Sequence, residues 1–161
     1  MLEIRKAIPG DNDVIWEIIR NTIATGDTYA FSPAAGKEKM LAYWCAADAH
    51  TYVALLNGKI AGTFVMKKNQ PDLGSHIANA GYMVSPSAAG QGIGKAMAEF
   101  SLVEAKRIGY RAMQFNFVVK SNQRAVRLWQ QLGFTIIGEI PEAFNHQVLG
   151  LTNAYIMYRK L

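Results

Sequence analysis

The sequence predicts an α/β (α+β) chain in which helices cover the faces of a mixed sheet. Two observations support this fold class. In the first half, two alternating apolar runs flank Asn57-Gly58, a pair typical of a two-residue hairpin turn. In the second half, strand patterns alternate with helical patterns that end at glycine, as in strand–helix–strand crossings. Hairpins and crossings in one chain give a mixed sheet.

The first half is expected to hold, in order, a strand at Leu2–Ala7, a helix at Val14–Ile23, a short helix at Lys37–Ala46, and a hairpin of Thr51–Leu56 with Lys59–Met66. The first strand rests on alternation of apolar and polar residues. Pro9-Gly10-Asp11 is expected to be a turn in which Asp11 caps the first helix. Apolar residues recur at helical spacing behind it.

The second half is expected to hold a strand at Ile77–Val84, a helix at Gly94–Ile108, a strand at Ala112–Val119, a helix at Asn122–Leu132, and strands at Thr135–Ile140 and Ala154–Tyr158. Gly109 and Gly133 end the two helices. In open α/β sheets, ligands bind beyond the carboxyl ends of the central strands. A glycine run follows Val84 at one such end.

The composition indicates one globular domain of 161 residues. The net charge is +5, but the basic residues are scattered, which argues against nucleic acid. A compact anionic ligand and ordinary surface charge remain equal explanations. No apolar stretch has the length of a membrane span, and the first residues do not resemble a signal peptide. The single cysteine, Cys45, offers no disulfide or metal cluster, so we expect a cytoplasmic protein without a metal.

The run "AGQGIGKAM" spaces three glycines, Gly90, Gly92 and Gly94, ahead of Lys95. The spacing fits neither a nucleotide-triphosphate loop nor a dinucleotide fingerprint. Glycine lets the backbone approach a ligand without Cβ atoms in the way, and a helix amino terminus favours negative charge. The amides from Gly90 to Lys95 are therefore expected to bind a pyrophosphate or a similar anion.

The same run, followed some thirty residues later by "NQRAVRLWQQLGF", resembles the two signature segments of the GCN5-related N-acetyltransferase (GNAT) family. The second segment matches at Asn122, Ala125, Leu128, Gly133 and Phe134. The resemblance implies the GNAT fold, a mixed, mostly antiparallel sheet of about seven strands flanked by four helices. It also implies acetyl-CoA as co-substrate and a homodimer.

The resemblance implies a set of cofactor-binding residues, namely Met83, Val84, Ala89, Gly90, Gln91, Gly92, Ile93, Gly94, Lys95, Asn122, Arg124 and Trp129. Two departures from the family pattern matter. Ala89 stands where the family has Arg or Gln, and Trp129 replaces the tyrosine that often protonates the leaving thiolate. Indole does not release its proton, so Trp129 is not the acid. Lys120, Arg124 and Arg127 either meet the 3′-phosphate or form a solvated face.

In the family, a backbone amide on the strand before the glycine run stabilises the oxyanion, which points here to Met83 or Val84. Many relatives carry a glutamate on that strand, whereas this chain has Asn79 there and Asn116 on the next strand. Neither amide side chain takes up a proton, so both are expected to orient substrate or water. This pair resembles a yeast-type subgroup that acetylates proline analogues such as L-azetidine-2-carboxylate.

Tyr29 and Phe31 are expected either to wall the acceptor pocket or to lie in the core. Asn116 lies among aromatic residues, where an unpaired amide would be costly to bury, so a functional role is expected for it. His146 and Glu142, in "PEAFNHQ" between the last strands, are the remaining candidates for a base. Because this loop often borders the substrate site in the family that the chain resembles, His146 is also expected to contact substrate, with an idle surface histidine as the alternative.

The resulting expectation is transfer of an acetyl group from acetyl-CoA to the amine of a small molecule, an amino acid or a toxic analogue, by direct attack in a ternary complex. An acetylated cysteine is not expected as a relay. The alternatives are a phosphinothricin-like compound, a polyamine or a peptide N-terminus as acceptor, and a non-catalytic acyl-CoA sensor.

Overall fold

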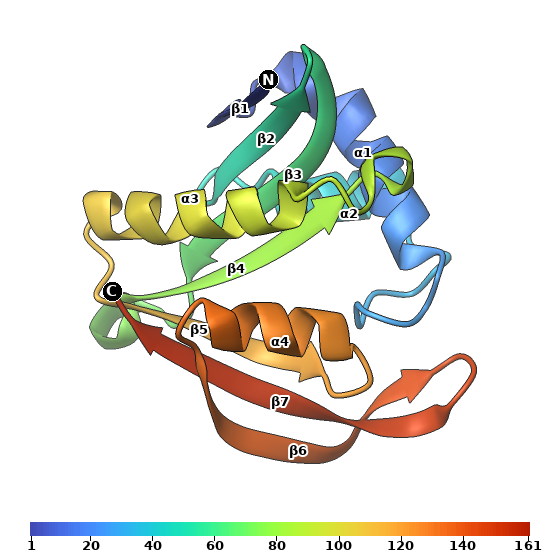
Figure 1. The fold of residues 1–161 in the computed structure, drawn as a ribbon, viewed down its shortest axis with the longest axis vertical. Coiled ribbons are helices and arrows are strands. Elements are labelled where there is room, and N and C mark those ends of the chain that lie inside the picture. The colour runs from blue at the N-terminus through green and yellow to red at the C-terminus, as the bar shows by residue number, and fades with distance from the viewer.

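The computed structural model describes residues 1–161 and contains one seven-stranded sheet in the order β1-β2-β3-β4-β5-β7-β6 (Figure 1). The strands are β1 (Leu2–Lys6), β2 (His50–Leu56), β3 (Lys59–Lys68), β4 (Ile77–Val84), β5 (Ala112–Val119), β6 (Thr135–His146) and β7 (Gly150–Lys160). Only β4 and β5 pair in parallel. The predicted mixed, mostly antiparallel sheet is confirmed.

Four α-helices cover the two faces of the sheet, as predicted. They are α1 (Asn12–Ile23), α2 (Lys37–Trp44), α3 (Ile93–Ile108) and α4 (Gln123–Gln131). In Figure 1, α3 and α4 lie on the face toward the viewer, and α1 and α2 lie behind the sheet. None of these helices has the length and apolar content that crossing a bilayer requires.

Strand alternation divides the apolar core between the two faces. Neighbouring residues of β2 illustrate this, because Ala54 belongs to the cluster under α3 and α4, whereas Val53 belongs to the cluster under α1 and α2. On α1 the four buried isoleucines recur at the helical spacing expected from the sequence: Ile15, Ile18, Ile19 and Ile23.

The sheet is forked between β4 and β5. The two strands pair only through Ile77 with Ala112 and Ala78 with Met113, near their amino ends. Beyond these pairs they diverge, and Figure 1 shows their carboxyl ends well separated. The loops that lead into α3 and α4 leave from these separated ends, so the fork brings the glycine run and the start of α4 to one end of the sheet.

Asp11 stands at the N-cap position of α1, as predicted, but its side chain makes no capping bond to that helix. Its carboxylate instead accepts two bonds from the Arg5 guanidinium and one from the backbone N–H of Ile8. Asp11 is almost fully buried, and a charged hydrogen bond to a partner on β1 replaces the weaker capping bond.

The last two strands are longer than predicted. The "PEAFNHQ" segment was expected as a connection, but β6 continues through it to His146 and pairs with the first residues of β7. The register shifts between Ile140 and Phe144, where Glu142 has a φ of +50°. Such a β-bulge lets a strand continue past Pro141, which cannot donate to the ladder.

Candidate active site

A groove of about 500 Å³ lies between the glycine run and α4. Ten of the predicted cofactor residues line it: Val84, Ala89, Gly90, Gly92, Ile93, Gly94, Lys95, Asn122, Arg124 and Trp129. Two do not. Gln91 is exposed outside the groove, and the Met83 side chain is buried in the opposite core cluster, beneath α1 and α2. The two signature segments therefore meet across one groove, without Gln91 and Met83.

The glycine run is shaped as an anion cradle. Gly90 and Gly92 have φ angles of +79° and +77°, and a Cβ at either position would meet no protein atom within 4 Å. Gly92 is the N-cap of α3, and the first helical bond runs from Ala96 to the Gly92 carbonyl. The N–H groups of the preceding three residues therefore have no partner within the helix. Together with the helix dipole, they suit a diphosphate.

The basic side chains around the groove differ in whether they already pair with an acidic side chain. Arg124 and Arg127 are exposed, line the groove and take part in no ion pair, so their charge is free for an anionic ligand. Lys120 is not free, because its ammonium lies 2.7 Å from the Glu139 carboxylate. Asn122 caps α4 by accepting from the Ala125 N–H at 3.3 Å, which fixes the helix end that forms this wall.

The structure distinguishes between the two candidate oxyanion donors on β4. The Ser85 N–H bonds the Ala61 carbonyl across the β3 side. Because amide directions alternate along a strand, the Met83 N–H points toward β3 as well, and the Val84 N–H points into the fork. Met83 is therefore wrong as a donor, and Val84 remains the candidate.

Tyr82, two residues before Val84, presents its backbone to the same fork and was missed from the sequence. Its N–H donates to the Tyr29 hydroxyl at 2.9 Å, and that hydroxyl donates to the Tyr82 carbonyl at 2.6 Å. Tyr29 thus replaces the bonds that β5 would have made. Burial raises the pKa of the Tyr29 phenol above its ordinary value, so it remains a protonated donor. Every second residue of a strand presents its backbone in the same direction, so Tyr82 could have been predicted from Val84, two residues later on β4.

A cavity of about 140 Å³ at the fork, here called the passage, lies between the groove and a second pocket and shares lining residues with both. It shares four lining residues with the groove, and these include Trp129 and Asn122. It shares six with the pocket, and these include Tyr29 and Phe115. The Trp129 ring lies 4.5 Å from the Phe115 ring and 5.1 Å from the Tyr82 ring, between centroids. Trp129 therefore forms an aromatic wall of the passage.

The second pocket, here called the acceptor pocket, has a volume of about 220 Å³ and lies on the α2 face of the fork. It brings together four residues predicted from the sequence: Tyr29, Phe31, Asn79 and Asn116. Tyr43, Trp44, Phe115 and Phe117 complete its aromatic walls and were not predicted. Trp44 is fixed there because its indole N–H donates to the buried Thr63 hydroxyl at 3.0 Å. In a sequence, aromatic residues that line a pocket have the same spacing as aromatic residues that pack in the core, so these four unpredicted residues could not be assigned to the pocket.

The two asparagines of the acceptor pocket make different contacts. The Asn79 Nδ2 donates to the Gln114 carbonyl at 3.0 Å, which bridges β4 and β5 just beyond their last backbone pair. Its Oδ1 accepts no hydrogen bond within the protein, and Asn79 lines the pocket. Asn116 is exposed. Its amide group is paired with Gln114 at 2.9 Å and Asn69 at 2.6 Å. Asn79 is therefore built into the fork, whereas Asn116 lies at the rim.

His146 is not brought to the acceptor pocket. It ends β6, and its Nδ1 accepts the N–H groups of Val148 and Leu149 at 3.1 Å each. These contacts hold the turn of the β6–β7 hairpin. Glu142 is exposed on the bulge of the same hairpin. The predictions that His146 binds substrate and that either side chain is near enough to act as a base are therefore not supported by this geometry.

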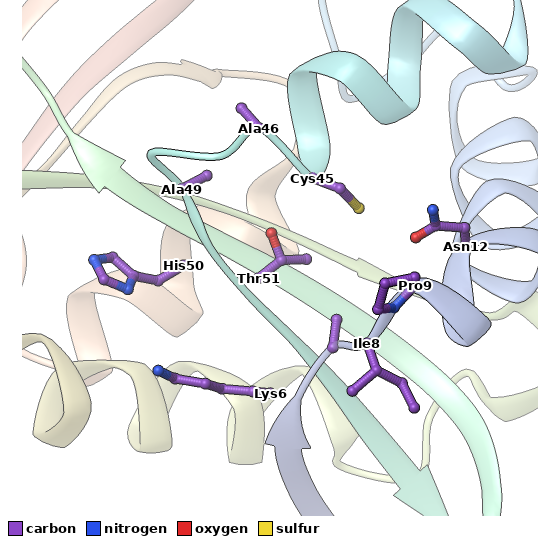
Figure 2. A pocket seen from close by; sticks show the side chains of 10 residues that line it. Lys6, Ile8, Pro9, Asn12, Cys45, Ala46, Ala49, His50 and Thr51 are labelled. Carbon is purple, nitrogen blue, oxygen red and sulfur yellow. The ribbon is translucent and has the colours of Figure 1, made fainter.

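Cys45 faces a separate cavity of about 280 Å³ at the end of α2 (Figure 2). Figure 2 shows its thiol between Asn12 of α1 and Thr51 of β2. This cavity shares no lining residue with the groove, the passage or the acceptor pocket. Burial raises the pKa of the Cys45 thiol, which disfavours the nucleophilic thiolate.

Comparisons with known proteins agree with this arrangement. The sequence model described as "Acetyltransferase (GNAT) family" matches residues 16–134. The chain is 41% identical over 100 residues to the N-acetyltransferase aca1 of Schizosaccharomyces pombe. That alignment covers 60% of this chain and 47% of the relative, so the chain spans about half the length of this curated relative.

Two solved structures show how far the fold is shared. A GCN5-related N-acetyltransferase from Kribbella flavida is 38% identical, with a TM-score of 0.95 over 99% of this chain and 98% of that chain. A phosphinothricin acetyltransferase from Sinorhizobium meliloti, solved in complex with acetyl-CoA, is 21% identical, with a TM-score of 0.87 over 99% of this chain and 88% of that chain. The second likeness shows the fold alone. The family match and the first structure show that the chain belongs to the acetyltransferase (GNAT) family.

Proposed function

We propose that the chain transfers the acetyl group of acetyl-CoA to the amine of a small molecule, an amino acid or an analogue of one. The observation that carries this proposal is the row of three adjoining cavities, namely the glycine groove, the passage at the fork and the acceptor pocket. A donor bound in the groove and an amine bound in the pocket would meet at the passage between them. Such a meeting point is what acyl transfer between two bound substrates requires.

The groove suits the donor. Its glycine run offers amides and open space for a diphosphate, and Arg124 and Arg127 offer charge for a further phosphate. Ala89 contributes no donor side chain, so the backbone carries the diphosphate contact. Acetyl-CoA supplies the chemistry of a thioester, an acetyl group already activated toward an amine.

The residues at the fork orient the reaction and do not move protons. The Val84 N–H is directed into the fork, and an amide aimed at developing negative charge contributes about 3 kcal/mol in comparable sites. Alignment of two bound reactants contributes roughly 7–11 kcal/mol. Trp129 and Phe115 line the passage with apolar surface. Because alignment is the larger share, a site without a strong acid or base can still be effective.

The acceptor pocket favours a small acceptor amine. Its volume of about 220 Å³ is below the range of drug-sized ligand sites, roughly 300–1,000 Å³. No carboxylate or imidazole lines it, so the amine must enter in its deprotonated form. An amino acid or a proline-like analogue fits this volume better than a protein lysine or a polyamine.

The location of the only cysteine supports direct attack on the donor. Cys45 opens to the separate cavity and not to the passage, so it is not placed to carry the acetyl group. We therefore expect Cys45→Ala to retain the wild-type rate. Loss of turnover in a folded Cys45→Ala protein would contradict direct transfer.

The test is a screen of thiol release from acetyl-CoA with pooled amines, followed by mass spectrometry of the product. The pools contain free amino acids, proline analogues, phosphinothricin, polyamines and peptides with a free N-terminus. We expect an acetylated amino acid or analogue among the products. Acetylation of a polyamine or of a peptide N-terminus alone would contradict the proposed acceptor class. Binding of CoA without thioester consumption by any pool would indicate a non-catalytic sensor.

We further propose that the chain acts in the cytoplasm as a homodimer. The single cysteine suits a reducing compartment.

The β6–β7 hairpin exposes Ile137, Val148, Leu149 and Leu151, each more than half exposed, along an edge of the sheet. Apolar side chains gathered on a sheet edge suit a second copy of the chain. Sedimentation equilibrium should then give twice the chain mass, and Val148→Asp should shift it toward the monomer.

A further inference from the structure

We propose that Lys67 binds the carboxylate of the acceptor at the rim of the acceptor pocket, and so selects amino acids over simple amines. This inference rests on the proposed function and names the substrate feature that the pocket recognises. Lys67 is not predicted from the sequence motifs, because only the pairing of β3 with β4 brings it to the site.

The strand register places Lys67 on the face of the acceptor pocket. Val65 lines that pocket, and Lys67 follows two residues later on β3, so its side chain leaves the same face of the sheet. Across the ladder, Lys67 pairs with Asn79, which also lines the pocket. Residues directly opposite on antiparallel strands lie side by side on one face. Lys67 is therefore the neighbour of Asn79.

The ammonium group of Lys67 is held toward the pocket by an aromatic contact. Its Nζ lies 3.3 Å from the centroid of the Tyr43 ring, and Tyr43 is one of the pocket walls. The side chain is half-buried, and Lys67 takes part in none of the five ion pairs of the chain. An ammonium over an aromatic face keeps its N–H donors, so it has spare capacity for an anion.

The remaining polar groups of the pocket do not duplicate this charge. No charged side chain is among the residues that line the pocket itself. The Asn79 Nδ2 is bonded to Gln114, so Asn79 offers its Oδ1, which accepts a hydrogen bond from an amine. An amino acid would then place its amine at Asn79, beside the fork, and its carboxylate at Lys67. This orientation directs the amine toward the passage.

The test compares Lys67→Met with Lys67→Arg and with the matched control Lys68→Met. Methionine keeps an unbranched stem without the charge, and arginine keeps the charge. Lys68 is the next residue on β3, so Lys68→Met removes the same charge from the opposite face of the sheet. Each protein is assayed with L-proline and L-prolinamide and with L-alanine and L-alaninamide. CoA affinity is measured by calorimetry.

We expect Lys67→Met to raise KM for the two carboxylates by about tenfold or more, the effect of losing a partly desolvated ion pair. KM for the two amides, kcat, and the Kd for CoA should stay within about twofold, and Lys67→Arg should recover most of the loss. Lys68→Met should resemble the wild type. Equal effects of Lys67→Met on acids and amides, or the same effect from Lys68→Met, would overturn the proposal while leaving acetyl transfer intact.

A binding measurement separates this proposal from the proposed function. L-proline is titrated into CoA-loaded wild-type protein and into CoA-loaded Lys67→Met. If no amine is acetylated, the proposed function fails, and this titration alone decides the role of Lys67. Weaker binding of L-proline to Lys67→Met supports the proposal, and equal binding, or no binding to either protein, overturns it.

Discussion

Gly94 tests whether the glycines of the run are required only by the backbone conformation or also by the close approach of a ligand. Gly90 and Gly92 have positive φ angles, so glycine suits their backbone whether or not a ligand binds. Gly94 lies in the first turn of α3 without a positive φ. The only atom near its missing Cβ is the Val84 Cγ2 at 3.7 Å, an ordinary contact. The protein alone therefore gives no reason for glycine at position 94, and close approach of a ligand does.

Gly94→Ala should therefore leave the fold as stable as before or more stable, and yet weaken CoA binding. Alanine in a helix is favoured over glycine by roughly 0.5–1 kcal/mol, and less near a helix end. A methyl group in the groove holds the diphosphate away from the amides. Loss of a hydrogen bond to a charged group costs about 1.5–3 kcal/mol, so the Kd for CoA should rise roughly 10- to 100-fold.

The assay pairs thermal unfolding with calorimetric titration of CoA. The matched control is Gly10→Ala. Like Gly94, Gly10 has no positive φ, and no atom lies within 4 Å of its own missing Cβ. Gly10 does not line the groove. Gly10→Ala should bind CoA as the wild type does. Wild-type CoA affinity in Gly94→Ala would refute a ligand-based reason for the glycine. A large loss of stability in Gly94→Ala would refute the packing argument.

Two further predictions concern the fork and the stability of the fold. Asn79→Ala removes the hydrogen bond that bridges β4 to the Gln114 carbonyl of β5. It should therefore lower the free energy of unfolding by about 1 kcal/mol in urea titrations and raise KM for the amine several-fold. An unchanged KM would contradict a role in holding the fork. The Glu104 carboxyl has its pKa lowered to about 2 by the Arg107 guanidinium, against an opposing effect of burial, with help from the Tyr52 hydroxyl. Because the folded pKa is below the unfolded value of about 4.3, this stabilisation is present above roughly pH 5 and is lost as the pH falls toward 2. Denaturant titrations from pH 7 to pH 3 should show a flatter decline for Glu104→Gln than for the wild type, and equal slopes would contradict this assignment.

The order of the elements could be predicted from the sequence because their signals are local. Alternation, helical spacing and the glycines at 58, 109 and 133 each act within a few residues. Two differences from the prediction arose where a distant residue decided the outcome. Asp11 resembles a helix cap until the fold brings Arg5 beside it. The segment after Ile140 resembles a loop because of Pro141, until β7 pairs with it across a bulge.

The donor half of the site was predictable to a greater extent than the acceptor half. The glycine run and the second signature segment are continuous stretches, and the structure places them on one groove. The acceptor pocket is assembled from the loop between α1 and α2 and from α2, β3, β4 and β5, so no single stretch of sequence defines it. Tyr43 and Lys67 illustrate this, since each acquires its place only through packing and strand register.

The most direct test of the central claim is a backbone amide NMR titration of the chain with CoA. We expect the largest shifts in the first turn of α3, from Gly92 to Lys95, and a further shift at Val84, because these amides face the groove and the fork. Residues around Cys45 in the separate cavity should not move. No shift at the glycine run with millimolar CoA, or shifts confined to the Cys45 cavity, would contradict the account.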